Sequence, residues 1–144
     1  PRTSSMSGLI KGDVMKMDDV ELAFCCCFSL GATAVTSMAV APLATAVVAG
    51  VQGAKRTSEL IPFCHPVALD ACDVSFEEDS EHRALEVTCA VATMHRTGVE
   101  MEALSGCSVA ALAVYDMTKA LSHSIVVEDL RLVEKTGGKS DYSE

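Results

Sequence analysis

The chain has 144 residues, the size of a single domain, and is long enough to bury a hydrophobic core without disulfides or metal ions. Eleven Lys and Arg against twenty Asp and Glu give a formal charge of −9, which excludes nucleic-acid binding over a broad basic face. Hydrophobic residues make up 49% of the chain and Trp is absent, so the predicted core consists of small aliphatic side chains.

The seven cysteines include three in a row at 25–27 and form no C-x-x-C pair. This odd number and spacing fit neither a disulfide framework nor a zinc ribbon, so they indicate a reducing compartment. No secretory signal is legible at the start of the chain. We therefore expect a protein of the cytoplasm or the mitochondrial matrix, with no metal and no cofactor.

A long uncharged run extends from Leu22 to Ala54, which exceeds the ~20 residues that span a bilayer. A membrane helix is conceivable, but the run is rich in small residues and broken by Gly and Pro, which favours a buried helix. Pro42 is suited to be the first residue of a separate helix, from Leu43 to about Leu60. Prolines at 62 and 66 predict that this helix ends and an extended segment begins.

The next segment alternates in the manner of a β-hairpin with one buried face. The residues predicted to face the core are Cys72, Val74, Phe76, Leu85, Val87, Cys89 and Val91, on either side of an acidic turn at 77–81.

A second helix is predicted from Thr97 to about Leu121, because Thr97 and Glu100 have the spacing of a capping box. A last strand is predicted from Ile125 to Val133. The order helix, strand, strand, helix, strand predicts an α+β protein, a ferredoxin-like sandwich with an antiparallel sheet, helices on one face and a first strand missing.

Candidate functional side chains occur in three places, each with a more ordinary interpretation. Cys64 and His65 lie between prolines, which suits a positioned acid/base group, although a loop His is more often solvated. Glu100 and Glu102 stand at a helix N-terminus, where the helix dipole alone stabilises carboxylates. The basic tail at 135–140 suits a mobile anion clamp, but it matches only the end of a phosphate-loop motif.

Asp116 and Lys119 have the spacing of an ordinary surface ion pair on the second helix. Glu102 lies 14 residues before Asp116 on nearly the same side of that helix, which separates the two by about 21 Å at 1.5 Å per residue. One small-molecule site cannot easily use both ends, so we expect two neighbouring subunits to contribute them.

Four strings in order resemble the molybdenum-cofactor biosynthesis protein C family: KRTSELIPFCHP at 55–66, TGVEMEAL at 97–104, SVAALAVYDMTKA at 108–120 and RLVEKTGGKS at 131–140. The likeness covers about two-thirds of the chain, from Leu43 to Asp141. It implies a ferredoxin-like subunit, a homohexamer built as a trimer of dimers, and sites shared between subunits. The implied activity is that of cyclic pyranopterin monophosphate synthase, a lyase that rearranges a cyclised GTP derivative and releases pyrophosphate.

The resemblance also implies roles for individual residues. Asp116 and Lys119 match the family's catalytic pair. Residues that match substrate-binding segments are Phe63, Cys64, His65, Met101 and Glu102, with Glu100 beside them. Positive charge for the triphosphate would come from Arg56, Lys135 and Lys139.

The N-terminal side departs from the family pattern. Lys11, in a Lys-Gly-Asp string, matches a catalytic lysine, but 28 residues from Met15 to Pro42 then intervene before the family's helix. We therefore divide the chain into an interrupted segment at 1–42 and a synthase domain at 43–144. We expect this interruption to displace Lys11 and to leave the chain with little or no synthase activity, which deletion of Met15 to Pro42 would raise by orders of magnitude. The alternative to an active synthase is therefore a catalytically silent homologue or structural subunit.

Overall fold

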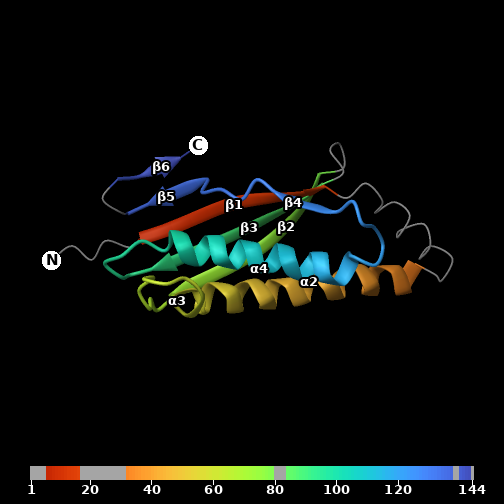
Figure 1. Cartoon of the computed structure of the whole chain (residues 1–144), viewed down its shortest axis with the longest axis horizontal. Helices are drawn as coiled ribbons and strands as arrows, with labels where there is room; N and C mark the ends of the chain where they lie inside the picture. The colour runs from red at the N-terminus through yellow and green to blue at the C-terminus, as the bar shows by residue number, and fades with distance from the viewer. Residues whose placement is uncertain (1–5, 17–31, 80–83, 138–139, 144) are drawn as a thin grey trace.

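In the computed structural model, two long helices cover one face of an antiparallel β-sheet (Figure 1). The structure describes residues 6–16, 32–79, 84–137 and 140–143, with the backbone alone described for 6–16 and 32–39. These two layers confirm the predicted α+β class and the helices on a single face of the sheet.

The described elements are β1 Met6–Lys16, α2 Ala32–Lys55, α3 Thr57–Leu60, β2 Ala71–Asp79, β3 Ala84–Thr93, α4 Glu100–Thr118, β4 Val126–Glu128, β5 Glu134–Thr136 and β6 Tyr142–Ser143. In the described part of the chain the sheet runs β2-β3-β1-β5-β6, and β4 also pairs with β1. The sequence order β-α-β-β-α-β is consistent with the predicted ferredoxin-like sandwich.

The expectation that the first strand is missing is wrong. β1 lies in the middle of the sheet, where it pairs with β3 along one edge and with β5 and β4 along the other. Its register with β3 runs from Met6 opposite Thr93 to Lys16 opposite Ala84, with an irregularity between Gly12 and Val14. A strand with neighbours on both sides has its backbone groups paired in two ladders, so β1 is integral to the fold.

The expectation that Pro42 begins a separate helix is also wrong, because α2 starts at Ala32 and continues through Pro42 to Lys55. Proline in a helix interior removes one hydrogen bond and costs about 3 kcal/mol. The long contact of α2 with α4 and the sheet offsets that cost. The interruption predicted at 15–42 therefore has regular structure at both ends, in β1 and in α2, while 17–31 lie outside the described residues.

Small residues allow α2 and α4 to approach closely. A Cβ added at Gly50 would lie 2.9 Å from the Gly106 carbonyl oxygen, and one added at Gly53 would lie 2.8 Å from Val109. Beneath this contact, the predicted alternation of the hairpin is confirmed, since Val74, Val87, Cys89 and Val91 are all buried. The core is aliphatic, as the composition predicts.

Two local predictions fail. Thr97 does not cap α4: the N-cap is Val99, which makes no side-chain cap hydrogen bond, and the Thr97 hydroxyl contacts His95 Nδ1 at 2.9 Å. The strand predicted at 125–133 is present only as β4, Val126–Glu128, and β5 begins at Glu134, beyond the predicted range. Asp129 adopts a left-handed backbone (φ +63°), a conformation that Asp tolerates, and this ends β4.

Candidate active site

Several of the predicted site residues lie at the two ends of α4. The N-terminal cluster consists of Cys64, Glu100, Glu102 and Lys135, which come from the loop after α3, the first turn of α4, and β5. The C-terminal pair consists of Asp116 and Lys119, at the last turn of α4. α4 is continuous between them, so the ends stay about 21 Å apart as predicted.

Glu102 is the buried acid of the N-terminal cluster. It is only 3% exposed, and the Cys64 thiol donates to Glu102 Oε1 across 3.9 Å. Burial raises the pKa of Glu102, and the nearby charge of Glu100 raises it further. Burial, followed by the charge of Glu102, likewise raises the pKa of the Cys64 thiol. A carboxyl group whose pKa moves toward neutrality is suited to exchange protons with a bound substrate.

Glu100 has the opposite electrostatic setting. Its Oε1 accepts from Lys135 Nζ at 2.5 Å, and both side chains are largely shielded from solvent. Burial alone would raise the pKa of Glu100, but the hydrogen bond and charge of Lys135, together with a backbone N–H, outweigh burial and lower it. Two carboxyls two residues apart thus have pKa values shifted in opposite directions, an arrangement typical of acid/base sites.

This difference predicts opposite pH effects on stability. Folding raises the pKa of Glu102 above its usual value of 4.5. The contribution of this carboxyl to folding stability is therefore present at low pH, and it is lost as pH rises from about 4.5 through the pKa of the folded state. We expect Glu102→Gln to gain stability relative to the native chain over that rise. Urea unfolding at several pH values measures the difference.

Glu100→Gln is the matched control for this test. Because folding lowers the pKa of Glu100, this carboxylate stabilises the folded state at any pH above its pKa in the unfolded chain. That stability is lost as pH falls through the pKa of the folded state. The Gln variant should therefore be less stable than the native chain near neutral pH, and the deficit should shrink in acid. The same pH trend in both variants would contradict the assignment.

The loop that carries Phe63, Cys64 and His65 contacts α4 through Cys64. Phe63 is fully exposed and has a left-handed backbone (φ +69°), and His65 is exposed beside it. Met101 on α4 is partly exposed, next to the buried Glu102. The structure therefore brings this predicted binding loop to the start of α4.

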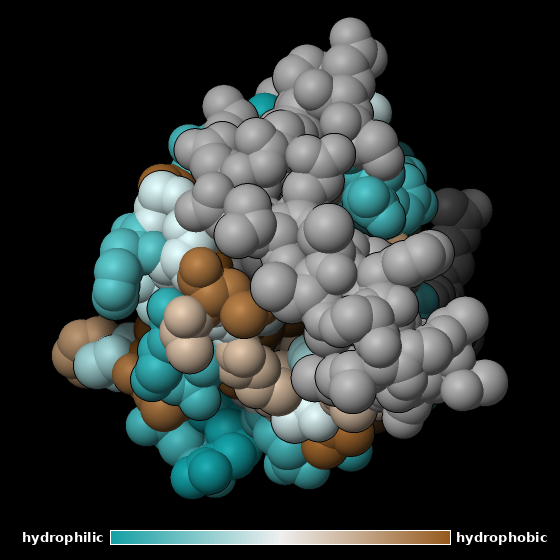
Figure 2. All heavy atoms as spheres, turned by 90° about the vertical axis from the view of Figure 1, so that its right-hand side faces the viewer, coloured by the Kyte–Doolittle hydropathy of each residue, from teal (hydrophilic) through white to brown (hydrophobic). Residues whose placement is uncertain are grey.

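The C-terminal pair is an exposed ion pair. Lys119 Nζ lies 2.6 Å from Asp116 Oδ1, with both side chains more than half exposed. The hydrogen bond with Asp116 and its negative charge raise the pKa of Lys119. Figure 2 views the molecule from the end at which α4 finishes, where hydrophilic side chains lie among small hydrophobic patches. Both side chains of this pair are therefore exposed at the described surface.

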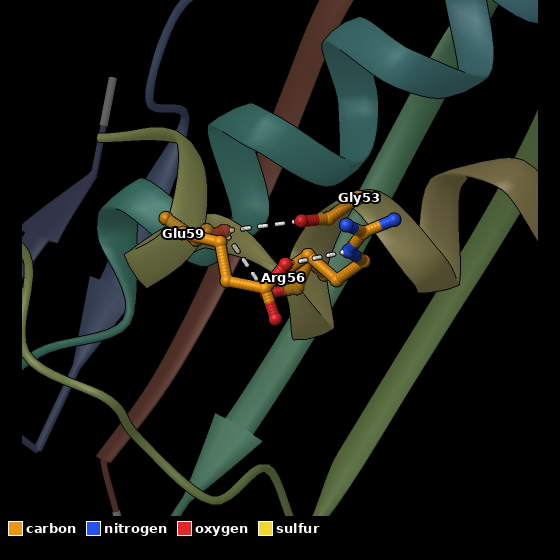
Figure 3. A network of polar contacts seen from close by, with 5 residues as sticks. Gly53, Arg56 and Glu59 are labelled. Carbon is orange, nitrogen blue, oxygen red and sulfur yellow. Dashed lines mark hydrogen bonds and ion pairs between the residues drawn. The ribbon is translucent and has the colours of Figure 1, made fainter.

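The predicted phosphate-binding cations have different settings. Arg56 follows the last turn of α2, where its backbone N–H donates to the Gly53 carbonyl oxygen at 3.2 Å. Its Nε contacts Glu59 Oε2 at 2.8 Å, as Figure 3 shows. Lys135 is paired with Glu100. Lys139 lies outside the described residues. The sequence did not predict the Glu100–Lys135 pair, because no local spacing links two residues that only the β5–α4 packing brings together.

Lys11 lies in β1, directly opposite Thr88 of β3. Its backbone stands between the part of β1 that pairs with β5 and the part that pairs with β4. The expectation that the interruption displaces this segment from the fold is therefore wrong for the backbone, which is held in the central strand.

Within residues 6–16, 32–79, 84–137 and 140–143, no helix combines the length and hydropathy needed for a membrane crossing. In the same residues, no group of three or more His, Cys, Asp or Glu is arranged to hold a metal ion.

Comparison with known proteins gives a consistent result. The family model described as MoaC family matches residues 32–138. A Xanthomonas oryzae pv. oryzae protein named cyclic pyranopterin monophosphate synthase is 59% identical over 97 residues, 67% of this chain and 58% of that protein. A protein of the same name from Heliobacterium modesticaldum is 55% identical over 100 residues, which are 69% of this chain and 63% of that protein. Another, from Thermoanaerobacter sp. strain X514, is 48% identical over 102 residues, which are 71% of this chain and 65% of that protein. The matched part of the chain spans less than two-thirds of each relative.

Proposed function

The chain belongs to the MoaC family, and we propose that it is a cyclic pyranopterin monophosphate synthase. Its substrate would be 3′,8-cyclo-7,8-dihydroguanosine triphosphate, which is rearranged to a pterin bearing a cyclic phosphate as pyrophosphate leaves. The support is the name shared by relatives 48–59% identical to this chain. The activity belongs to molybdenum cofactor biosynthesis. Cytoplasm or mitochondrial matrix stays a prediction for its location.

The structural observation that carries the proposal is the pair of carboxyls at the start of α4, Glu100 and Glu102, whose pKa values are shifted in opposite directions. Ring rearrangement needs groups that give and take protons near neutrality, and burial shifts the pKa of Glu102 upward, in that direction. Glu100, held ionised by Lys135, would fix the position of Lys135 for an anionic substrate. Phosphoryl chemistry is largely positioning and charge stabilisation, which suits such a cluster.

We assign the remaining roles from the family resemblance. Asp116 and Lys119 would be the catalytic pair, joined by Lys11. The loop at 63–65 and Met101 would contact substrate with Glu102. Arg56, Lys135 and Lys139 would face the triphosphate.

Because the two ends of α4 are too far apart for one small molecule, we propose a site shared between subunits of a homo-oligomer, a hexamer in the family pattern. The loop at 63–65 of one subunit would face the C-terminal pair of its neighbour. The full exposure of Phe63 and the exposure of Asp116 leave both surfaces available for this contact.

The direct test is to incubate the purified chain with the cyclised GTP intermediate and to detect the pterin product and pyrophosphate. Formation of both above a no-enzyme control supports the synthase. A folded, oligomeric chain that yields neither would identify a silent homologue.

The shared site predicts complementation. A mixture of His65→Ala and Asp116→Asn subunits should regain part of the activity that each variant lacks, because some sites in mixed oligomers would contain neither substitution. Activity after subunit exchange, with mixing verified by two affinity tags, measures this. Inactive mixed oligomers would contradict the shared site for this residue pair.

A further inference from the structure

Two cysteines that the proposed function does not use lie on adjacent strands, Cys72 on β2 and Cys89 on β3. The antiparallel register pairs Cys72 with Val91 and Val74 with Cys89, so the cysteines are diagonal neighbours. Alternate residues of a strand share a face, and Val74, Cys89 and Val91 are all buried. Both thiols therefore project from the core-facing side of the sheet.

The two thiols have different surroundings. Cys89 is completely buried, whereas Cys72 is partly exposed and packs at the margin of the core. The Cys89 thiol donates a hydrogen bond to the Cys72 sulfur, which lowers the pKa of Cys72 against the opposing effect of burial. The positive charge of Lys55 lowers that pKa further. Cys72 thus has the more accessible sulfur and the greater thiolate character.

The position of β2 makes a bond between these sulfurs feasible. The register places the two cysteines on the same face as diagonal neighbours, which are farther apart in the backbone than directly opposed residues. β2 is an edge strand of the described sheet and pairs only with β3. It can therefore adjust its twist toward β3 more easily than a strand held on both sides.

We propose that Cys72 and Cys89 form a peroxide-sensitive modification site that closes to an intramolecular disulfide. The Cys72 thiolate attacks one oxygen of hydrogen peroxide, forming an S–O bond and breaking the O–O bond, which leaves a sulfenic acid and a hydroxide. The hydroxide takes up the proton that the Cys72 thiol gave up and leaves as water. The Cys89 sulfur then attacks the Cys72 sulfur, forming the S–S bond. The S–O bond breaks, and the departing hydroxide leaves as water with the Cys89 proton. Two thiols and one peroxide become one disulfide and two waters.

The closed bond would lie against α4 as well as between two strands. A Cβ added at Gly106 of α4 would be 2.7 Å from Cys89 Sγ, so this sulfur lies directly beneath the helix. Cys107 is a competing thiol in the same core cluster, but its Sγ donates to the Val87 carbonyl oxygen at 3.3 Å. Cys72 is therefore the partner that the geometry favours for Cys89.

Peptide mapping of the full chain tests the proposal. The reduced protein is treated with hydrogen peroxide, free thiols are alkylated, and tryptic peptides are analysed by mass spectrometry. We expect peptide 57–83 joined to peptide 84–96 with the loss of two hydrogens, fragmentation that locates the bond at Cys72 rather than Cys64, and reversal by dithiothreitol. A bond from Cys89 to Cys64 or Cys107, or full alkylation of Cys72 after treatment, would overturn it.

Three variants separate the two steps. Cys89→Ala should leave a sulfenic acid on Cys72 that dimedone traps, because the resolving thiol is gone. Cys72→Ala should leave Cys89 unoxidised. Cys107→Ala, the matched buried control, should form the cross-link as the native chain does. Dimedone labelling of Cys89 in the Cys72→Ala variant would contradict the assignment of the attacking thiol, and the native-chain map decides the outcome if a variant fails to fold.

Discussion

Asp116→Asn is expected to lower synthase turnover by about 10²- to 10⁴-fold, the usual loss when a positioned acid/base group is removed. Lys119→Ala should lose a similar factor. Lys119 Nζ lies 2.6 Å from Asp116 Oδ1, so each group holds the other in place. Residues that act as a unit show non-additive losses, so the double variant should be little worse than either single variant. Steady-state kinetics with the cyclised GTP substrate measures all three.

Asp129→Asn provides a control at another exposed ion pair. Asp129 Oδ2 lies 2.8 Å from Arg131 Nη1, the pair is about half exposed, and Asn tolerates the left-handed backbone at this position. Its turnover should match that of the native chain. If the losses of the two single variants multiply in the Asp116/Lys119 double variant, the two residues do not act as a unit. In that case, or if Asp116→Asn keeps normal turnover, the C-terminal pair is an ordinary surface ion pair.

Lys11→Ala is expected to cause the second large loss, of two or more orders of magnitude in turnover. The family resemblance assigns Lys11 a catalytic charge, and β1 holds its backbone in the centre of the sheet. A fixed cation opposite developing phosphate charge is worth several kcal/mol in a site shielded from water. Turnover of the purified variant, with its thermal unfolding recorded in parallel, separates lost chemistry from lost folding.

Lys16→Ala, at the end of the same strand, is the matched control and should keep its turnover. The full chain is needed for both variants, because deleting Met15 to Pro42 would remove the end of β1 and the first part of α2. If Lys11→Ala retained normal turnover while Asp116→Asn did not, the lysine would be absent from the site and the family assignment at this position would be wrong.

Local patterns in the sequence determined much of this protein. The alternation through Val74, Val87, Cys89 and Val91 predicted the hairpin, because side chains of a strand alternate between faces. The helical spacing after Glu100 predicted α4 and therefore the distance between Glu102 and Asp116. The strings that resemble the family identified the candidate residues, since each string is continuous in sequence.

Only the tertiary structure decided what depends on partners far away in the chain. β1 is central because β3, β4 and β5 supply its hydrogen bonds, which no pattern within residues 6–16 reveals. Pro42 remains inside α2 because helix packing outweighs a local preference. Glu100 pairs with Lys135 instead of completing the predicted capping box, because β5 brings Lys135 Nζ to 2.5 Å from Glu100 Oε1. A charged partner binds a carboxylate more strongly than a backbone N–H does.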